Sequence, residues 1–314
     1  MENFSSFERV VGKISQGEKE NILREKSDRF NDQFFEVLEG KEREKTDEEL
    51  AILSLANEAT NELRQTYGLT DFDVPSKNIH VIKKEKWPNE KDAAFYNSMM
   101  QAIAIKEEHA KIVFLKSILH EMIHLKSYGS MQITANEDPQ EHEYRSGITV
   151  TKRDGSRLFF RNINEAVVEE LTLQVFSRLY DHSIFSEEVK QTSEIAEKGK
   201  NALSSEGKKL FTKDTYYAEI EDIGNDKGRI SANSFVYSKE RRILKKLIHK
   251  LFDRNSDDFE NEQQLFGLFA SSMITGNILT LGKLIDSTFS KGTFRKIGEL
   301  DSNIDEQEAF IDAL

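Results

Sequence analysis

One stretch of the sequence, residues 109–129, is apolar on nearly every side of the helix that its spacing predicts. A helix of this kind has to be buried. The same stretch nevertheless carries His120, Glu121 and His124 in the order H-E-x-x-H. Two histidines and a glutamate are costly to bury without a partner. The apolar side chains around them are Ile112, Val113, Leu115, Ile118, Leu119, Met122, Ile123 and Leu125.

The spacing of these polar residues suits a metal site. Four residues make slightly more than one helical turn, so His120 and His124 project from one face and can reach the same ion. Glu121 lies roughly 100° further round the helix and can face a water molecule at the metal without displacing it. Zinc lowers the pKa of such a water to about 7, and a neighbouring carboxylate can take its proton. A histidine pair satisfied within the core is the alternative.

A second polar pair follows in the segment "NINEAVVEEL". Glu165 and Glu169 are four residues apart, on one face of a helix whose other positions are mostly apolar. Catalytic zinc usually keeps three protein ligands and one open position, and Glu165 can supply the third ligand. Glu169 can accept the free Nδ1 proton of a ligating histidine. Taken alone, the two glutamates could equally form a solvent-facing acidic pair.

Composition narrows the function classes. The chain has no cysteine, which excludes disulfides and thiolate zinc sites and leaves His, Asp and Glu as the strong metal ligands. Its formal net charge of −12 disfavours nucleic acid and anionic membranes as partners. No window approaches the roughly 18 apolar residues of a membrane span, and the first residues lack an export signal. We expect a soluble, cytoplasmic protein.

Hydrophobic spacing predicts helices on both sides of a region with strand character. Residues 129–147 read as polar and irregular, and residues 181–234 as a polar, helix-prone lid or mobile connector. The expected helices are 18–40, 47–68, 109–129, 164–180, 238–252, 262–276 and 277–289. The expected strands lie in 78–87 and 98–108, and in a hairpin over 148–163 that turns at Asp154 and Gly155.

Together, the H-E-x-x-H helix and the downstream N-E-x-x-x-E helix resemble the gluzincins, the thermolysin-like zinc metallopeptidases. The resemblance covers the five residues His120, Glu121, His124, Glu165 and Glu169, together with the order of elements over residues 78–180. Two features depart from thermolysin. Glu169 stands where that enzyme has aspartate. Glu165 follows His124 by 41 positions, a longer separation than in thermolysin, and this is tolerated because the entropic cost of loop closure grows slowly with length. A metzincin would need a glycine and a histidine shortly after the motif, where this chain has Ser127 and Ser130.

The resemblance implies an α+β zincin-like fold with a small sheet and active-site helix in an upper lobe and a mainly helical lower lobe. We expect an N-terminal helical segment at 1–68, a catalytic upper lobe at 69–180 and a helical C-terminal lobe at 181–314. The resemblance to gluzincins further implies a Zn²⁺-dependent peptidase that cleaves a peptide or protein substrate, with Glu121 as general base. A catalytically silent zincin-like binding module and a metal-free helical interaction protein are the alternatives.

The resemblance also implies a Tyr or His that stabilises the oxyanion formed at the scissile carbonyl. No strict sequence motif identifies this residue. Tyr237 is the first candidate because it stands just before an amphipathic helix. Tyr216, Tyr217 and His249 are the others. The strand in 98–108 is expected to offer a free edge, near Asn97, for an extended substrate. The remaining histidines are interpreted as surface or structural: His80, His109, His142 and His182.

Overall fold

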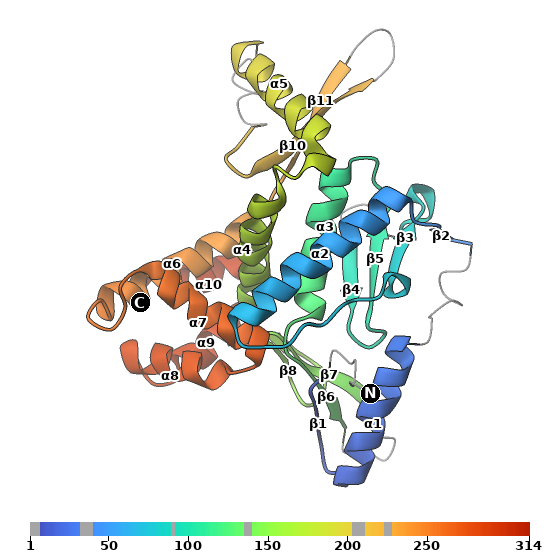
Figure 1. Cartoon of the computed structure of the whole chain (residues 1–314). Helices are drawn as coiled ribbons and strands as arrows, with labels where there is room; N and C mark the ends of the chain where they lie inside the picture. The colour runs from blue at the N-terminus through green and yellow to red at the C-terminus, as the bar shows by residue number, and fades with distance from the viewer. Residues whose placement is uncertain (1–6, 32–39, 89–91, 135–139, 203–210, 223–227) are drawn as a thin grey trace.

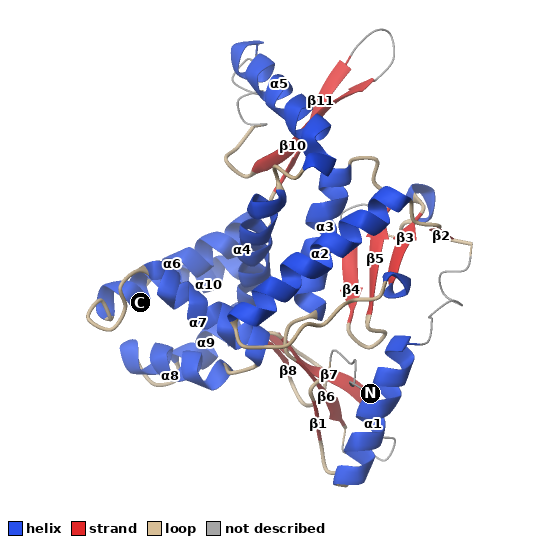
Figure 2. Ribbon diagram, in the orientation of Figure 1, coloured by secondary structure: helices blue, strands red, loops and turns tan. Residues whose placement is uncertain are grey.

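The computed structural model describes residues 7–31, 40–88, 92–134, 140–202, 211–222 and 228–314, and it has an α+β architecture (Figure 1). Helices make up most of the described chain, and the strands form small sheets (Figure 2). The helices are α1 Gln16–Asn31, α2 Asp47–Thr66, α3 Lys111–Leu125, α4 Arg161–Leu179, α5 Ser186–Ala202, α6 Ser238–Arg254, α7 Glu262–Thr275, α8 Ile278–Thr288, α9 Thr293–Glu299 and α10 Ile304–Asp312. The strands are β1 Arg9–Val11, β2 Glu42–Arg43, β3 Ile79–Ile82, β4 Ala94–Asn97, β5 Ala102–Lys106, β6 Gly129–Ile133, β7 Glu141–Ser146, β8 Thr149–Thr151, β9 Leu158–Phe159, β10 Thr215–Asp222 and β11 Gly228–Ser234.

A four-stranded sheet packs beside α3 in the order β2-β3-β5-β4. The central strands β3 and β5 run parallel, and their apolar residues are almost fully buried, as parallel strands usually are. Strand β5 therefore has neighbours on both sides, so the expectation that it offers a free edge is wrong. The edges of this sheet are β2 and β4, and β4 is the edge next to β5 and ends at Asn97. The sequence did not indicate strand β4, because its residues are mixed in character and only partly buried.

A second sheet has the order β1-β6-β7-β8-β9. Strands β6 and β7 contradict the irregular structure expected for 129–147, of which 135–139 lie outside the described residues. Strands β6 and β7 pair antiparallel with a register shift between Ser130 and Met131. Strand β7 has the sequence EHEYRS and is only partly buried, so it lacks the apolar alternation that marks most strands. The hairpin β8–β9, which turns at Asp154 and Gly155, confirms the expectation for that segment.

Helix α4 joins two hydrophobic cores. Its C-terminal residues Val175 and Phe176 belong to the core formed with α2, α3, β3 and β5. Its N-terminal half, from Ile163 to Leu171, belongs to a core built with α6 to α10. The helices expected at 109–129, 164–180, 238–252, 262–276 and 277–289 are present, with ends that differ by a few residues.

The described residues between 181 and 234 include helix α5 and the β10–β11 hairpin, which project from one end of the molecule (Figure 1). Strands β10 and β11 pair antiparallel, so the expectation of a helix-prone connector is wrong for them. Their threonines, tyrosines and isoleucines favour strands, although charged residues between them obscure the pattern. This unit also supports α3: the Glu188 carboxylate in α5 accepts the backbone N–H groups of Lys111 and Ile112 at 2.8 and 2.7 Å. It thereby caps a helix start that has no side-chain cap of its own.

The N-terminal region contains α1 and α2, and two strands that the sequence did not predict. Strand β1 pairs parallel with β6, and β2 pairs with β3. Helix α2 begins with a complete capping box between Thr46 and Glu49. The predicted helical residues 32–39 lie outside the described part of the chain. Among the described helices, none combines the length and apolar character needed to cross a membrane.

Lys126, directly after α3, is an unusual buried cation. It is 1% exposed, and its Nζ donates to Asn61 Oδ1 at 2.9 Å and to the Asn57 carbonyl at 3.2 Å. Burial lowers its pKa to about 7, against the attraction of Asp73. An unfolded lysine has a pKa of about 10.4. Between these two values the unfolded chain holds a proton that the folded chain has released, so stability rises with pH in this window.

We therefore predict that Lys126→Met changes the pH dependence of stability. The free energy of unfolding of the wild type, relative to the variant, should be constant below pH 7 and should rise from pH 7 to about 10. Urea unfolding of metal-free protein at several pH values measures this difference. The exposed Lys190→Met variant is the control and should run parallel to the wild type. Parallel curves for Lys126→Met would show that burial does not shift this lysine.

Candidate metal centre

Helices α3 and α4 bring three of the predicted residues together. His120 and His124 lie on one face of α3, and Glu165 lies opposite them near the start of α4. Their possible ligand atoms all lie within 4.8 Å of one another, so this group could bind a metal ion. All three side chains are largely buried. The sequence spacing within each helix and the contact between α3 and α4 create this cluster.

The distances within the cluster match those of a tetrahedral ion. The two histidine Nε2 atoms are 3.3 Å apart, and Glu165 Oε2 lies 3.2 Å from His124 Nε2 and 3.5 Å from His120 Nε2. Ligands about 2.0–2.1 Å from a tetrahedral ion are separated from each other by about 3.3–3.4 Å. Two imidazoles and one carboxylate are a donor set that zinc accepts. The residues present therefore fit a three-ligand metal site.

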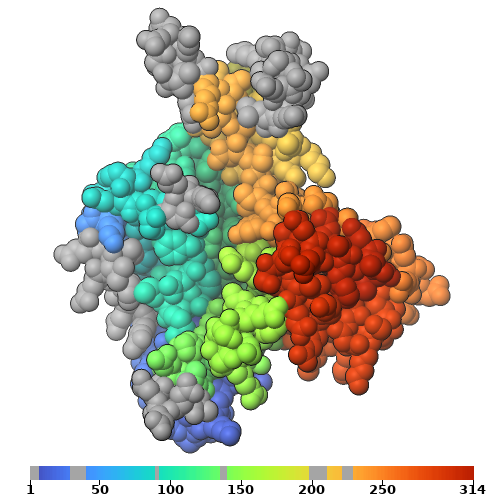
Figure 3. Space-filling view, turned by 180° about the vertical axis from the view of Figure 1, so that it is seen from behind, coloured from blue at the N-terminus to red at the C-terminus, as the bar shows by residue number. Residues whose placement is uncertain are grey.

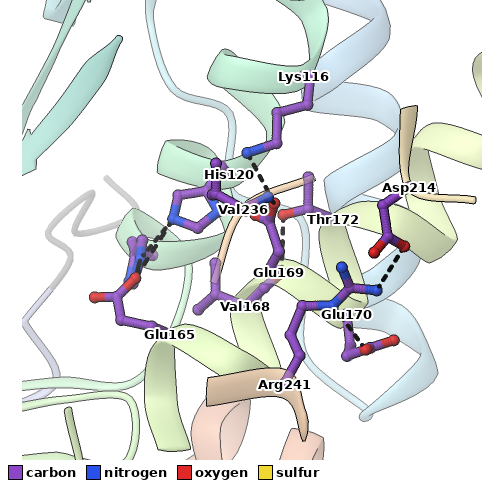
Figure 4. Close-up of polar contacts among 11 residues, drawn as sticks. Lys116, His120, Glu165, Val168, Glu169, Glu170, Thr172, Asp214, Val236 and Arg241 are labelled. Atoms are coloured by element: carbon purple, nitrogen blue, oxygen red, sulfur yellow. Dashed lines mark hydrogen bonds and ion pairs between the residues drawn. The ribbon is translucent and has the colours of Figure 1, made fainter. Parts of the chain in front are cut away.

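Glu169, one turn after Glu165 on α4, is fully buried and contacts His120 from behind (Figure 4). Its Oε2 lies 2.8 Å from His120 Nδ1, so that nitrogen donates and Nε2 is left facing the cluster. Its Oε1 lies 3.0 Å from Lys116 Nζ and accepts the Val236 backbone N–H at 2.7 Å. Glu169 thus has the position that the sequence predicted for it.

The electrostatics follow from this packing. Burial would lower the pKa of His120, but hydrogen bonds to Glu165 and Glu169 outweigh it and raise the pKa to about 9. Burial would raise the pKa of Glu169, but His120 and Lys116 lower it to about 2. The histidines likewise hold the pKa of Glu165 well below its usual range, against the effect of burial. Both carboxylates are ionised at neutral pH, and their negative charge favours a cation between the histidines.

Tyr237 completes the cluster from the link between β11 and α6. Its ring stacks on that of His120, with 5.6 Å between centroids and 11° between planes. Burial and the negative charges of Glu165 and Glu121 raise its pKa, so the phenol keeps its proton at neutral pH. Tyr237 and Glu165 line the same cleft. Among the four oxyanion candidates, Tyr237 is therefore the one that the structure brings to the cluster.

A cleft of about 290 Å³ opens over the cluster. Glu121, 8% exposed, lines it beside the two histidines. Strand β4 contributes Phe95, and β7 contributes Glu143 from the segment that was expected to be irregular. In Figure 3 the green residues of β7 to β9 lie between the teal part of the chain and the orange to red C-terminal helices. A larger cavity of about 950 Å³ lies against β1, β6 and β7 and contains none of the predicted site residues.

The other candidates lie away from the cluster. Tyr216 and Tyr217 are buried in the core where β10 packs against α5, and His249 is exposed and paired with Glu262. The remaining four histidines are also elsewhere, in structural or surface positions: His80 pairs with Glu42, His109 with Glu219, His182 caps a short helix, and His142 lies on β7.

Sequence reasoning missed Lys116 and the Val236 backbone N–H, which both contact Glu169. Lys116 could have been found, because it lies four residues before His120 and so on the same face of α3. No sequence pattern indicated the contact of Val236 with Glu169, because this contact depends on how the link before α6 packs against α4. The chain was compared with protein-family models, curated proteins and solved structures, and none of them matches it.

We predict that the cluster binds zinc and that affinity depends on both glutamates of α4. Glu165→Ala removes a ligand and should weaken zinc retention strongly, whereas Glu169→Gln keeps all three ligands and should lower zinc affinity by about 10–100-fold, because it weakens the contact that orients His120. Competition with a chromophoric chelator on untagged protein measures both. Glu62→Ala removes an exposed carboxylate paired with Arg178 and is the matched control. Equal zinc affinity in all four proteins would exclude this cluster as the binding site.

Proposed function

We propose that the protein is a zinc-dependent metallopeptidase that hydrolyses peptide bonds in a peptide or protein substrate. The observation that carries the proposal is the triangle of His120, His124 and Glu165, with the carboxylate of Glu121 beside it in an open cleft. A structural metal site is usually closed by four protein ligands, whereas a hydrolytic site keeps a position free. Three ligands at the floor of a cleft therefore favour chemistry over a purely structural role.

Zinc bound here would supply Lewis-acid chemistry, making water more acidic and polarising the substrate carbonyl. Glu121 is the general base in this proposal: it takes a proton from the attacking water and passes it to the leaving amine. Its place next to His120 in the chain puts it on α3, beside the ligand face and within the cleft. Glu169 holds the His120 ring in the orientation that leaves Nε2 towards the cluster.

Tyr237 would stabilise the negative charge that develops on the carbonyl oxygen. A phenol can do this only as an O–H donor, and the raised pKa of Tyr237 keeps the proton in place. The ring lies flat against His120, so the phenol reaches the cluster beside a ligand ring. Tyr237 thereby combines a protonated donor with a position at the cleft.

The substrate would bind as an extended chain beside β4. This edge strand pairs with β5 on one side, and its residues Phe95 and Tyr96 line the cleft. Adding a strand to a sheet edge uses backbone hydrogen bonds and demands little of the sequence. In the same proposal the β2-β3-β5-β4 sheet with α3 is the upper lobe of a zincin fold, as the resemblance to gluzincins implies. A chain without cysteines suits work in the reducing cytoplasm.

Glu121→Gln should keep the zinc and lose the activity. The amide has nearly the shape of the carboxylate but cannot accept the proton, so we predict a fall in kcat of about 10²–10⁴-fold. Zinc content per chain and cleavage of a mixed peptide library, read by mass spectrometry, measure the two effects. Wild-type turnover in this variant would exclude the mechanism. Zinc retention without cleavage by the wild type would favour the catalytically silent module.

Tyr237→Phe should lower kcat by about 10²–10³-fold with little change in KM, because the lost hydrogen bond forms mainly in the transition state. The fold should survive, since the ring and its stacking on His120 remain. Tyr217→Phe is the matched control, because Tyr217 is buried away from the cleft and bonds Glu219. A rise in KM at constant kcat would assign Tyr237 to substrate binding instead.

A further inference from the structure

Tyr237 lies in a three-residue link, 235–237, between β11 and α6. Its backbone is in the left-handed region, with φ of 55°, which a residue with a bulky side chain adopts only where its surroundings determine it. The two strands that precede the link project away from the molecule (Figure 1). Only the base of the hairpin, where Tyr216 packs on Phe235 with 5.2 Å between ring centroids, can therefore help to fix the link over the cluster.

The residues before Tyr237 are tied to buried groups. Val236 donates its N–H to Glu169 Oε1 at 2.7 Å, and Phe235 donates its N–H to the Asp214 carbonyl at 2.9 Å. The side chain of Phe235 packs near Lys116, whose Nζ lies 5.9 Å from the ring centroid. These contacts fix where the link begins. They do not fix the turn by which it enters α6.

The residue that ties down that turn is Arg241, one turn into α6 and 5% exposed. Its Nε donates to Glu170 Oε1 on α4 at 2.8 Å, and a terminal nitrogen lies 3.4 Å from Asp214 Oδ1 (Figure 4). Its backbone N–H donates to the Tyr237 carbonyl at 2.8 Å. Arg241 therefore joins the turn of Tyr237 to α4, the helix that carries Glu165, and to Asp214, which also holds Phe235.

We propose that Arg241 is a positioning residue that holds the Tyr237 phenol over the metal cluster. Neighbouring glutamates of α4 act on the two sides of the link: Glu169 holds the backbone before Tyr237, and Glu170 holds the arginine after it. The planar guanidinium suits this task because it addresses two acceptors at fixed angles. The consequence for turnover rests on the proposed peptidase function, whereas the placement of the phenol does not.

Fluorine NMR of the full chain labelled with 3-fluorotyrosine tests the placement without zinc or substrate. The chain has eight tyrosines, and the signal that disappears in Tyr237→Phe is that of Tyr237. Arg241→Met should shift or broaden this signal and leave the other signals in place. Arg242→Met is the matched control, because Arg242 is on the same helix and pairs with Glu308 at the surface. An unchanged Tyr237 signal in Arg241→Met overturns the proposal.

Kinetics then test whether Arg241 acts through the phenol. We expect Arg241→Met to keep its zinc and to lower kcat by about 10-fold or more, since a displacement of about 1 Å can cost 10²-fold. In the Tyr237→Phe background the same change should have no further effect on kcat. An equal loss in both backgrounds would show that Arg241 acts through the fold alone and would overturn the proposal.

Two further variants cover the case in which Arg241→Met does not fold. Arg241→Lys keeps the charge but loses the fork, and Asp214→Asn keeps the shape but weakens the ion pair. Each variant should shift the Tyr237 signal, but by less than Arg241→Met does. The kcat of Arg241→Lys should lie between those of Arg241→Met and the wild type. If neither moves it, the proposal fails. If the wild type cleaves no peptide while Arg241→Met still moves the signal, the peptidase function fails and the positioning role stands.

Discussion

The buried carboxylate of Glu169 is the interaction on which the arrangement of the site depends. It is inaccessible to solvent, so its charge must be satisfied by protein groups. Three groups from two parts of the chain do this: Lys116 and His120 on α3, and the Val236 N–H before α6. Removing one partner from such a buried charge is strongly destabilising. One side chain thereby fixes the relative positions of the histidine helix, the glutamate helix and the link that carries Tyr237.

Helix α4 places the Glu169 carboxylate between α3 and the link that carries Tyr237. It runs between the two hydrophobic cores and presents glutamates at 165, 169 and 170 to different neighbours. Glu165 faces the histidines, Glu169 faces the back of His120, and Glu170 pairs with Arg241 and Lys245. The first position suits a metal ligand and the other two hold groups in place. The position of the polar groups in the cleft thus depends on a helix whose apolar residues are packed in the two hydrophobic cores.

The central part of the site could be predicted from the sequence because it depends on helical spacing. His120 and His124, like Glu165 and Glu169, are four residues apart, and any helix places such residues on one face. The apolar surroundings of each helix indicated burial, and burial required that the polar groups meet. Tyr237 was a weaker prediction, since its position before an amphipathic helix says little about which surface that helix faces.

The strands were harder to predict, for a physical reason. Strand β7 is only partly buried and rich in charge, so no apolar alternation marks it, and β1 and β2 are too short to show any period. Strands β10 and β11 pair in a projecting hairpin whose charged residues mask its β-forming residues. Contacts such as those of Val236 and Arg241 join residues about 70 positions away in the chain. No local pattern encodes them.

Diffraction from crystals grown with zinc, recorded on both sides of the zinc absorption edge, tests the central claim most directly. The account predicts one anomalous peak at about 2.0–2.2 Å from His120 Nε2, His124 Nε2 and a carboxylate oxygen of Glu165, with Glu121 outside the ligand set. A cleft without an anomalous peak at saturating zinc, or a peak held by other residues, would contradict it.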